Sequence, residues 1–331
     1  GGVACPFPPA LALALLVPHP PSPEPTPPRP VHLPVLVDEV LRMLDPKPGE
    51  VCVDCTAGLG GHAKRLARII GPTGTLVLND TDSVNLARAA ANVRTACEAS
   101  GAIPPRIEPL HGNFAEIPWR VQTLGLKADL VLADLGFASN QVDDPARGLS
   151  FMRDGPLDMR LDQSRGLTAA DLVNSMDERE LARLLEEFGE ERQASRIARK
   201  LVQARATGPI STTGELADLV RSVVVRSGGG ADPATRTFQA LRIAVNDELG
   251  SLEALLAGLE PSRRGVWLAS GCRVGFLTFH SLEDRPVKRA FAKSVEQGAY
   301  DVSGGAVAGS QAEIESNARA RSAKLRVIRY S

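Results

Sequence analysis

The chain has 331 residues, of which 43% are hydrophobic and 23% are charged. These ordinary globular values exclude a wholly disordered chain, a collagen-like chain and a bundle of membrane helices. The 38 Lys and Arg residues nearly balance the 39 Asp and Glu residues, which leaves a formal net charge of −1. A polyanionic partner would therefore need a local basic surface, because the whole molecule carries no positive field.

Residues 1–30 hold 11 of the 25 prolines and two charged residues, Glu24 and Arg29. This composition predicts a proline-rich disordered leader that takes no part in the fold. The apolar run Leu11–Val17 is short for a signal peptide and follows no basic segment, so a signal peptide is not expected. The chain begins at Gly1, and a truncated targeting leader therefore stays open.

From Val31 onward, strand and helix patterns alternate, which indicates an α/β sheet with crossover helices. Short apolar runs that end in polar or glycine residues predict buried parallel strands at Val51–Cys55, Thr75–Asn79, Ile107–Leu110 and Ala128–Ala133. Helical patterns lie between or before them at Val37–Leu44, His62–Ile70 and Ser83–Ala99.

The alternation stops in the second half of the chain. A helical pattern runs from Thr168 to about Leu259, with breaks at Gly189, Gly208-Pro209 and Gly228–Gly230, before a last strand at Arg273–Phe279. A helical block that interrupts a sheet pattern indicates an inserted domain. We therefore expect a Rossmann-like α/β domain built from residues 31–145 and 245–331, with an all-helical insertion at 146–244. Residues 295–316 are poor in large apolar groups and predict a loop.

The five cysteines form an odd, scattered set, which argues against a disulfide framework and favours a reducing compartment. Cys52 and Cys55 make a C-x-x-C pair, but no second pair follows at zinc-site spacing. Buried thiols are the favoured interpretation, and metal or redox use is the alternative.

A glycine turn connects the first predicted strand to its helix, in the run Val51 to His62. Glycine lets the backbone approach a ligand closely, and the helix start offers unpaired N–H groups. Asp80 stands 19 residues beyond Gly61, at the end of the next strand, where an acidic side chain accepts the hydroxyls of a ribose. These residues favour a nucleoside-binding cleft; a tight turn with a solvated aspartate is the alternative, and Asp82 is a rival to Asp80.

The cofactor of such a cleft could be a dinucleotide or S-adenosyl-L-methionine. A dinucleotide site has the spacing G-x-G-x-x-G, whereas here the spacing is Gly58-x-Gly60-Gly61 followed by His62. The difference favours S-adenosylmethionine, which has no phosphate to bind. A P-loop is excluded, because no Gly-Lys-Ser/Thr follows.

The fourth predicted strand ends in Asp134, followed by Gly136 and Phe137. A carboxylate at the carboxyl end of a central strand lies where an open α/β sheet binds its substrate. The amino group of a nucleobase has a delocalised lone pair, so hydrogen-bond acceptors must hold and orient it for methylation. Asp134 could supply an acceptor and Phe137 could stack on the base; a turn cap and core packing are the respective alternatives.

Several longer segments resemble one family, the small-subunit ribosomal RNA cytosine-N4 methyltransferases, also called the MraW or RsmH family. The segments that carry the resemblance are His32–Leu36, Asp54–Thr56 with Gly58–His62, His111–Phe114, Asp134–Gly136, Arg147–Arg160, Gly189–Arg192, Thr235–Arg242 and Phe279–Arg285. Together they span roughly residues 31 to 331, and they are too long and irregular to arise by chance.

The resemblance implies methylation of a cytidine in the decoding region of small-subunit (16S-type) rRNA, within an assembled 30S-type particle. It places the cofactor contacts on Gly60, Gly61, His62, Asp80, Phe114, Asp134 and Gln141, and it makes Asp134 the candidate catalytic residue. Two segments depart from the family pattern. Thr81 stands between two aspartates where the family usually has Arg, and Phe137-Ala138-Ser139-Asn140-Gln141 stands where it usually has Val-Ser-Ser-Pro-Gln.

Other polar segments have two interpretations each. His280–Arg285 follows the last predicted strand and could cap a helix through Ser281 and Asp284 or face the substrate; a metal site there is disfavoured. The basic stretch Asn317–Ser331 could contact phosphates or be a solvated terminus. Arg192, Arg196 and Arg199 are spaced to share one helix face, which could bind RNA or simply face solvent.

The sequence therefore predicts an S-adenosylmethionine-dependent rRNA methyltransferase of the bacterial cytoplasm, with no metal and no membrane partner. A methyltransferase on DNA or protein amino groups is a rival, and so is an assembly factor that binds the cofactor without turnover. A homodimer is left open.

Overall fold

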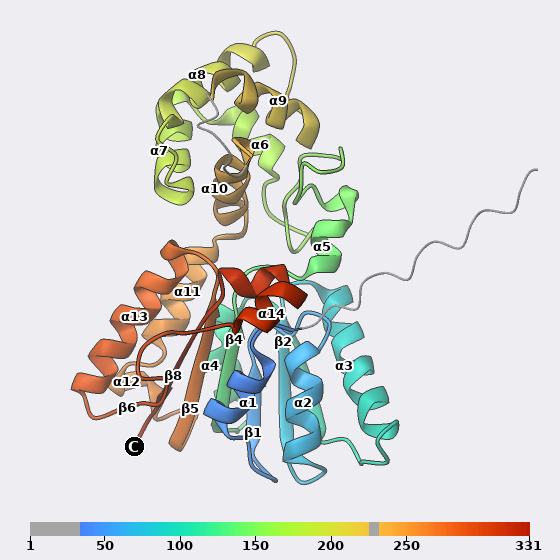
Figure 1. Cartoon of the computed structure of the whole chain (residues 1–331), viewed down its shortest axis with the longest axis vertical. Helices are drawn as coiled ribbons and strands as arrows, with labels where there is room; N and C mark the ends of the chain where they lie inside the picture. Colours follow the sequence, from blue (N-terminus) through green and yellow to red (C-terminus); the bar gives the residue numbers. More distant parts are fainter. Residues whose placement is uncertain (1–33, 225–231) are drawn as a thin grey trace, which may run out of the picture. The chain divides into compact units, whose positions relative to one another are not determined.

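The computed structural model describes residues 34–224 and 232–331 (Figure 1). The proline-rich leader predicted at 1–30 and the break predicted at Gly228–Gly230 lie outside the described residues. No helix of the described segments is long and apolar enough to cross a membrane.

A single sheet with the strand order β3-β2-β1-β4-β5-β8-β6 forms the centre of the fold, and β7 also pairs with β8. The first five strands are parallel, whereas β8 runs antiparallel to β5, β6 and β7. Their bounds are β1 Val51–Asp54, β2 Thr75–Asp80, β3 Arg106–His111, β4 Ala128–Asp134, β5 Leu268–Thr278, β6 Tyr300–Asp301, β7 Val307–Ala308 and β8 Lys324–Arg329. The five predicted strands are confirmed, but the prediction that all are buried is wrong for β3, an edge strand whose residues are exposed or partly exposed.

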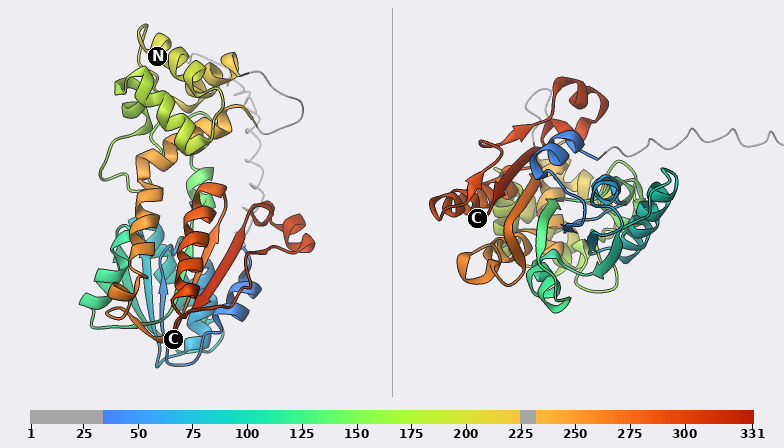
Figure 2. Two further views of the ribbon diagram at one scale, coloured as in Figure 1. Left: turned by 90° about the vertical axis from the view of Figure 1, so that its left-hand side faces the viewer. Right: turned by 90° about the horizontal axis from the view of Figure 1, so that it is seen from below.

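Helices cover both faces of this sheet (Figure 2). They are α1 Val37–Leu44, α2 Gly61–Ile70, α3 Ser83–Glu98, α4 Ile117–Thr123, α11 Glu248–Ala257, α12 Pro261–Arg264 and α13 Ser281–Glu296, with a 3-10 turn, η1, at Phe114–Glu116. Successive strand side chains point to opposite faces, so Leu130 and Leu132 join the core under α1–α3, while Val131 joins the core under α4, α11 and α13. Burial on both faces explains why β1, β2 and β4 are apolar over most of their length.

The segment between β4 and β5 is helical, as its sequence pattern predicts. It contains α5 Ser139–Asp143, the 3-10 turn η2 Pro145–Arg147, α6 Ala169–Ser175, α7 Glu178–Gly189, α8 Ala194–Arg205, α9 Thr213–Val223 and α10 Ala234–Asn246. Thr168, Asp177 and Thr212 begin α6, α7 and α9 by accepting a backbone N–H three residues on. A third hydrophobic cluster, separate from the two sheet cores, joins residues from Leu157 to Leu241.

The C-terminal region differs from the sequence-based expectation. The loop expected at 295–316 contains the short strands β6 and β7 and the helix α14, Gln311–Ser316. The interpretation of the final stretch as a free basic tail is wrong, because its residues form the 3-10 turn η3 at Ala318–Arg321 and then β8. Leu325, Val327 and Ile328 are buried there, so pairing with β5 and the apolar contacts outweigh the basic composition.

The cysteines of the described segments are free thiols in the core. They are Cys52, Cys55, Cys97 and Cys272, and Cys5 lies outside the described residues. Burial raises the pKa of Cys52 and of Cys55, which keeps both as neutral thiols. The buried-thiol interpretation of the C-x-x-C pair is confirmed.

Candidate functional site

The glycine turn after β1 has a backbone that requires glycine. Gly60 caps the start of α2 at φ 79°, a left-handed conformation in which a Cβ would lie 3.1 Å from the Ala89 carbonyl oxygen. A Cβ on Gly61 would lie 2.9 Å from Pro34, which connects the glycine turn to the Pro34–Leu36 segment. Glycine is therefore required at both positions by close packing against Ala89 and Pro34, and the turn connects the carboxyl end of β1 to the start of α2.

Asp80 closes this turn from the end of β2. Its carboxylate accepts the backbone N–H of Gly58 at 2.7 Å and that of Asp82 at 2.8 Å. Burial raises the pKa of Asp80 to about 6, and the two backbone N–H groups partly offset that rise. Each carboxylate oxygen retains a second lone pair for a ribose hydroxyl.

Asp82, the alternative candidate for binding the ribose, has protein partners on both carboxylate oxygens. One of its oxygens caps α3 by accepting from the N–H groups of Val84 and Asn85. The other accepts from Gln141 and forms an ion pair with Arg147. The carboxylate is 3% exposed, so the geometry favours Asp80 as the ribose acid.

A pocket opens beside these residues. On the sheet side it is lined by Thr81, Asn113, Phe114, Leu135 and Gly136, and on the opposite side by Leu161, Asn246, Glu248, Ser251, Leu252 and Glu283. The Phe114 ring and Leu135 provide apolar walls, while amide and carboxyl groups provide polar ones. The walls of the pocket are therefore partly apolar and partly polar.

Asp134 ends β4 at the same edge of the sheet. Its backbone N–H donates to Thr56 Oγ1 at 2.7 Å, which fixes the main chain, and its Oδ1 is buried without a hydrogen-bond partner among the described residues. Its Oδ2 lies 3.7 Å from His62 Nε2. A buried acceptor with no partner points to a ligand that supplies the donor or the positive charge.

Burial sets the charge states of this pair. It raises the pKa of Asp134 to about 6, with the cation Arg319 opposing the rise and Glu283 adding to it. It lowers the pKa of His62 to about 4, so His62 is neutral at pH 7 and does not neutralise Asp134. Asp134 therefore carries its charge at neutral pH beside an uncharged imidazole.

Phe137 and Gln141 take positions that the sequence could not predict. The Arg242 guanidinium lies 4.5 Å from the centre of the Phe137 ring and covers one of its faces. Gln141 is 4% exposed; its Oε1 accepts the Ala138 N–H, and its Nε2 donates to Asp82. A base that stacks on Phe137 would use the other face, and Gln141 faces the loop and Asp82.

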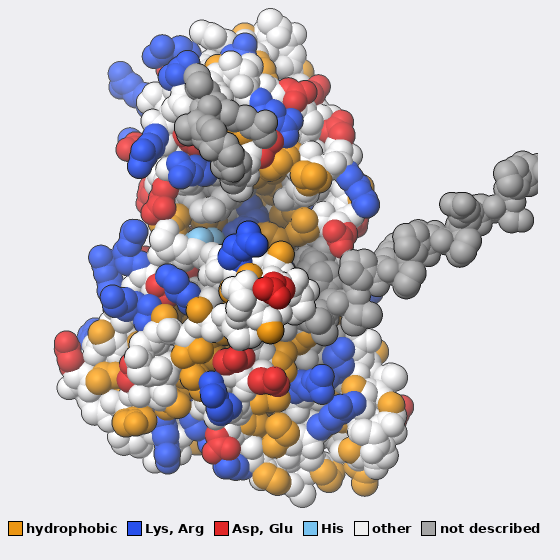
Figure 3. All heavy atoms as spheres, viewed as in Figure 1, with side chains coloured by type: hydrophobic (Ala, Val, Ile, Leu, Met, Phe, Trp, Pro, Cys, Tyr) orange, Lys and Arg blue, Asp and Glu red, His pale blue; other side chains and the backbone are white. Residues whose placement is uncertain are grey.

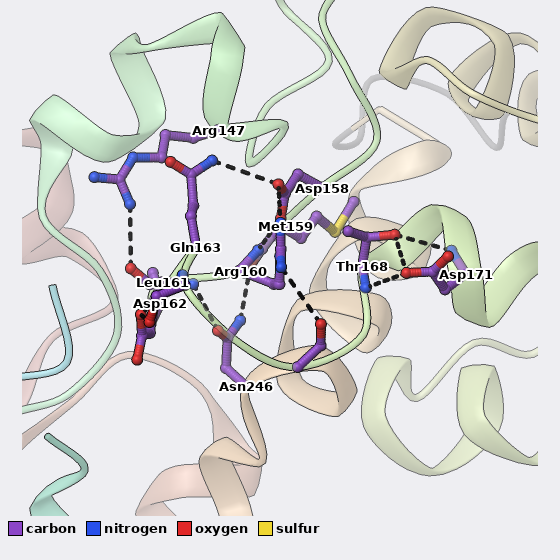
Figure 4. A network of polar contacts seen from close by, with 12 residues as sticks. Arg147, Asp158, Met159, Arg160, Leu161, Asp162, Gln163, Thr168, Asp171 and Asn246 are labelled. Atoms are coloured by element: carbon purple, nitrogen blue, oxygen red, sulfur yellow. Dashed lines mark hydrogen bonds and ion pairs between the residues drawn. The ribbon is translucent and has the colours of Figure 1, made fainter.

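The ion pair of Arg147 with Asp82 has no signal in the local sequence. Arg147 also donates to the Leu161 carbonyl at 3.1 Å, and Asn246 binds Leu161 N and the Met159 carbonyl (Figure 4). The partners are 65 and 85 residues apart in the chain. These contacts join the start of the helical segment to α10 and to the cofactor side of the sheet.

The His280–Arg285 segment begins α13, and the capping-box interpretation is wrong. His280 is the N-cap residue without a side-chain cap, and the Ser281 hydroxyl donates instead to Glu190 at 3.1 Å. Asp284 forms an ion pair with Arg326 of β8 at 2.8 Å. Contacts with β8 and with the end of α7 therefore take the place of local capping.

His280, Glu283 and Glu248 bring three ligand-type atoms within 4.8 Å of one another. Arg242 already holds both oxygens of Glu248, at 2.7 and 2.9 Å, and Glu283 accepts the Phe279 N–H at 2.7 Å. These contacts satisfy the carboxylates from within the protein.

The parallel sheet with one reversed strand, the glycine turn, the strand-end acids and the adjoining pocket define a Rossmann-like protein of the methyltransferase class. Residues 29–331 match the model of the MraW methylase family. Three proteins that carry the name ribosomal RNA small subunit methyltransferase H are close relatives: 42% identical in Symbiobacterium thermophilum, 44% in Halorhodospira halophila and 45% in Sorangium cellulosum. The matches cover 89–91% of this chain and 92–96% of those proteins.

The chain belongs to the MraW methylase family. Solved structures are much less similar: TrmN from Thermus thermophilus is 15% identical with a TM-score of 0.38, over 89% of this chain and 48% of that chain. The family assignment therefore rests on the sequence matches. It makes the protein a methyltransferase with S-adenosyl-L-methionine as its methyl donor.

Proposed function

We propose that this protein transfers a methyl group to the N4 atom of a cytidine in the decoding region of small-subunit rRNA, within an assembled 30S-type particle in the cytoplasm. The names of the relatives support the substrate class. The observation that carries the chemistry is Asp134, a largely buried carboxylate whose Oδ1 has no hydrogen-bond partner among the described residues, at the end of the strand that leads into the Leu135–Gly136 wall of the pocket. A site that transfers a methyl to an amino group requires such an acceptor.

The residues at the strand ends would hold the methyl donor. Gly60, Gly61 and His62 supply the close backbone approach at α2, and Asp80 supplies the ribose acceptor. Phe114 supplies an apolar wall for the adenine. Gln141 acts through the loop it braces, because its amide is used by Ala138 and Asp82.

When bound, S-adenosylmethionine supplies an electrophilic methyl carbon on a positively charged sulfur. Transfer would join this carbon to the cytosine N4 while the electron pair of the carbon–sulfur bond leaves with the sulfur, and N4 would then lose one proton. Asp134 holds the amino group by accepting its N–H and is the proposed acceptor of that proton, with bulk water as the final sink. Orientation supplies most of the acceleration, because N4 is a weak nucleophile whose lone pair must be aimed at the methyl carbon.

We further propose that residues 31–145 and 245–331 form the methyltransferase domain and that 146–244 form the inserted substrate-recognition domain. The separate hydrophobic cluster of the helical segment supports this division. The predicted basic helix face needs one correction: α8 begins at Ala194, so Arg192 precedes the helix. Arg192, Arg196 and Arg199 are nevertheless all exposed, and Figure 3 shows basic side chains over α8 and α13.

Transfer of labelled methyl groups to small-subunit particles, naked rRNA and DNA tests the proposal. We expect label in the particle rRNA, recovered as N4-methylcytidine after nuclease digestion. Label in DNA or in protein would replace this function with one of the rival methyltransferases. Cofactor binding without transfer to any acceptor would favour an assembly factor.

A further inference from the structure

The C-terminal turn η3 brings the guanidinium of Arg319 to the candidate methyl-transfer site. Arg319 Nη2 donates to the Phe137 carbonyl at 3.2 Å, and its guanidinium lies 5.2 Å from the centre of the Phe279 ring. Asn317 holds the main chain of this turn by accepting the Arg319 N–H at 3.3 Å. Arg319 thus contacts the segment after β4 and the segment after β5, although it lies 182 residues from Phe137 in the chain.

The segment that Arg319 contacts begins with Asp134. Leu135 N–H donates to the Leu277 carbonyl at 3.0 Å, which fixes the first part of the turn to β5. The Phe137 carbonyl is the next anchoring point, and the Arg242 guanidinium packs on the ring of the same residue. The turn that carries Asp134 is therefore held at its far end by Arg319.

The charges around Asp134 come from four elements. His62 of α2 lies 3.7 Å away and is neutral at pH 7, Asp54 of β1 and Glu283 of α13 repel the carboxylate, and Arg319 of η3 attracts it. Because Asp134 is buried, an attractive charge acts on it through a medium that screens weakly. Arg319 opposes the effect of burial on this carboxylate.

We propose that Arg319 is a positioning residue of methyl transfer: its guanidinium anchors the Asp134–Phe137 turn through the Phe137 carbonyl and packs on the Phe279 ring, which holds the Asp134 carboxylate in place for the amino group of the acceptor. The inference rests on the proposed function, in which Asp134 receives a proton of that amino group. It also gives the C-terminal basic segment a role inside the site in place of the solvated or phosphate-binding tail that the sequence suggested.

The test compares Arg319→Gln and Arg319→Lys with Arg321→Gln, a control that removes an exposed cation from the same turn. The measurement is kcat/KM on small-subunit particles between pH 5 and 8.5. Loss of the cation raises the pKa of Asp134, so the pH below which activity falls should move upward by at least about half a unit in Arg319→Gln. Arg319→Lys should keep most of the wild-type profile, and Arg321→Gln should reproduce it.

A second readout does not depend on turnover. The Asp134 carboxyl carbon, assigned by its disappearance in Asp134→Asn and followed by 13C NMR, should titrate at higher pH in Arg319→Gln than in the wild type. An unmoved titration overturns the proposal, and so does wild-type activity at every pH in Arg319→Gln. Failure of the wild type to methylate particles would instead refute the proposed function, while the NMR titration would still decide the electrostatic role of Arg319.

Discussion

At the scale of single residues, burial raises the pKa of the carboxylates at the ends of the parallel strands. Burial raises the pKa of Asp134 from 3.8 to about 6, so the folded protein binds a proton that the unfolded chain releases between those values. Stability from this group is therefore fully present below about pH 4 and is lost as the pH rises through about 6. Asp80 and Asp54 have raised pKa values from the same cause and act in the same direction.

Asp134→Asn should separate stability from activity. The amide removes a buried charge, so the variant should melt roughly 2 °C above the wild type at pH 8, corresponding to about 1 kcal/mol, and equal it near pH 4. Methyl transfer should fall at least about tenfold, near 1.4 kcal/mol of transition-state stabilisation. Calorimetric melting and labelled transfer check the two effects, and wild-type turnover in the variant would exclude a catalytic role for Asp134.

Asp80→Ala should weaken S-adenosylmethionine binding by roughly 1.5–3 kcal/mol, the loss expected for hydrogen bonds to a charged acceptor. The same change frees the Gly58 N–H, so the glycine turn loses its closing contact as well. Isothermal titration calorimetry measures the affinity, and Glu98→Ala, which removes an exposed carboxylate of α3, serves as the control. Unchanged affinity in a folded Asp80→Ala protein would remove the ribose assignment.

At the scale of elements, the strands and helices that could be predicted are those with a clear hydrophobic pattern in their own sequence. The parallel strands β1, β2 and β4 are continuous buried runs, and burial on both faces makes such runs apolar throughout. β8 was missed because its basic residues suggested a tail, although Lys324, Leu325, Arg326 and Val327 alternate with the period of a strand. Its pairing with β5 depends on a strand about 50 residues earlier, which no local pattern reveals.

In the candidate site, too, the features that depend on local sequence could be predicted, whereas the long-range contacts could not. The glycine turn, Asp80 and Asp134 could be predicted because strand ends of a parallel sheet meet at one edge. The bond from Gln141 to Asp82 and the contact of Arg319 with Phe137 join residues 59 and 182 positions apart. The sequence could name those residues as polar or aromatic but could not say what they contact.

The ion pair between Arg147 and Asp82 should stabilise the connection between the sheet and the helical segment. Arg147→Met keeps the length of the stem but leaves a 3%-exposed carboxylate without its cation, so we expect a loss of about 3 kcal/mol in urea unfolding. Arg165→Met breaks an ion pair whose arginine is 63% exposed and should cost less than about 1 kcal/mol. Similar small losses of unfolding free energy in both variants would show that the three other donors to Asp82 stabilise its buried charge without Arg147.

At the scale of the whole molecule, the near-zero net charge means that rRNA binding must come from local basic surfaces. Several basic side chains are already engaged: Arg147 pairs with Asp82, Arg242 with Glu248, and Arg326 with Asp284. Arg196 donates to Gln193, and Arg199 has a 3.4 Å contact with Glu178 while staying 63% exposed. Exposed arginines of this kind can exchange a weak protein partner for an RNA phosphate at little cost.

Replacing Arg192, Arg196 and Arg199 together by Ala should weaken binding to the small-subunit particle while leaving S-adenosylmethionine affinity nearly unchanged. Each lost phosphate contact should flatten the slope of log affinity against log salt by up to about 0.7–0.9. The matched control is the triple variant Arg65, Arg88 and Arg94 to Ala, which removes the same charge from exposed positions on α2 and α3. Long-range attraction alone would weaken both variants equally, because both lose three charges. A specific interface requires that the first triple variant melts normally yet loses both affinity and salt slope relative to the second, and equal slopes would exclude these arginines from the RNA contact.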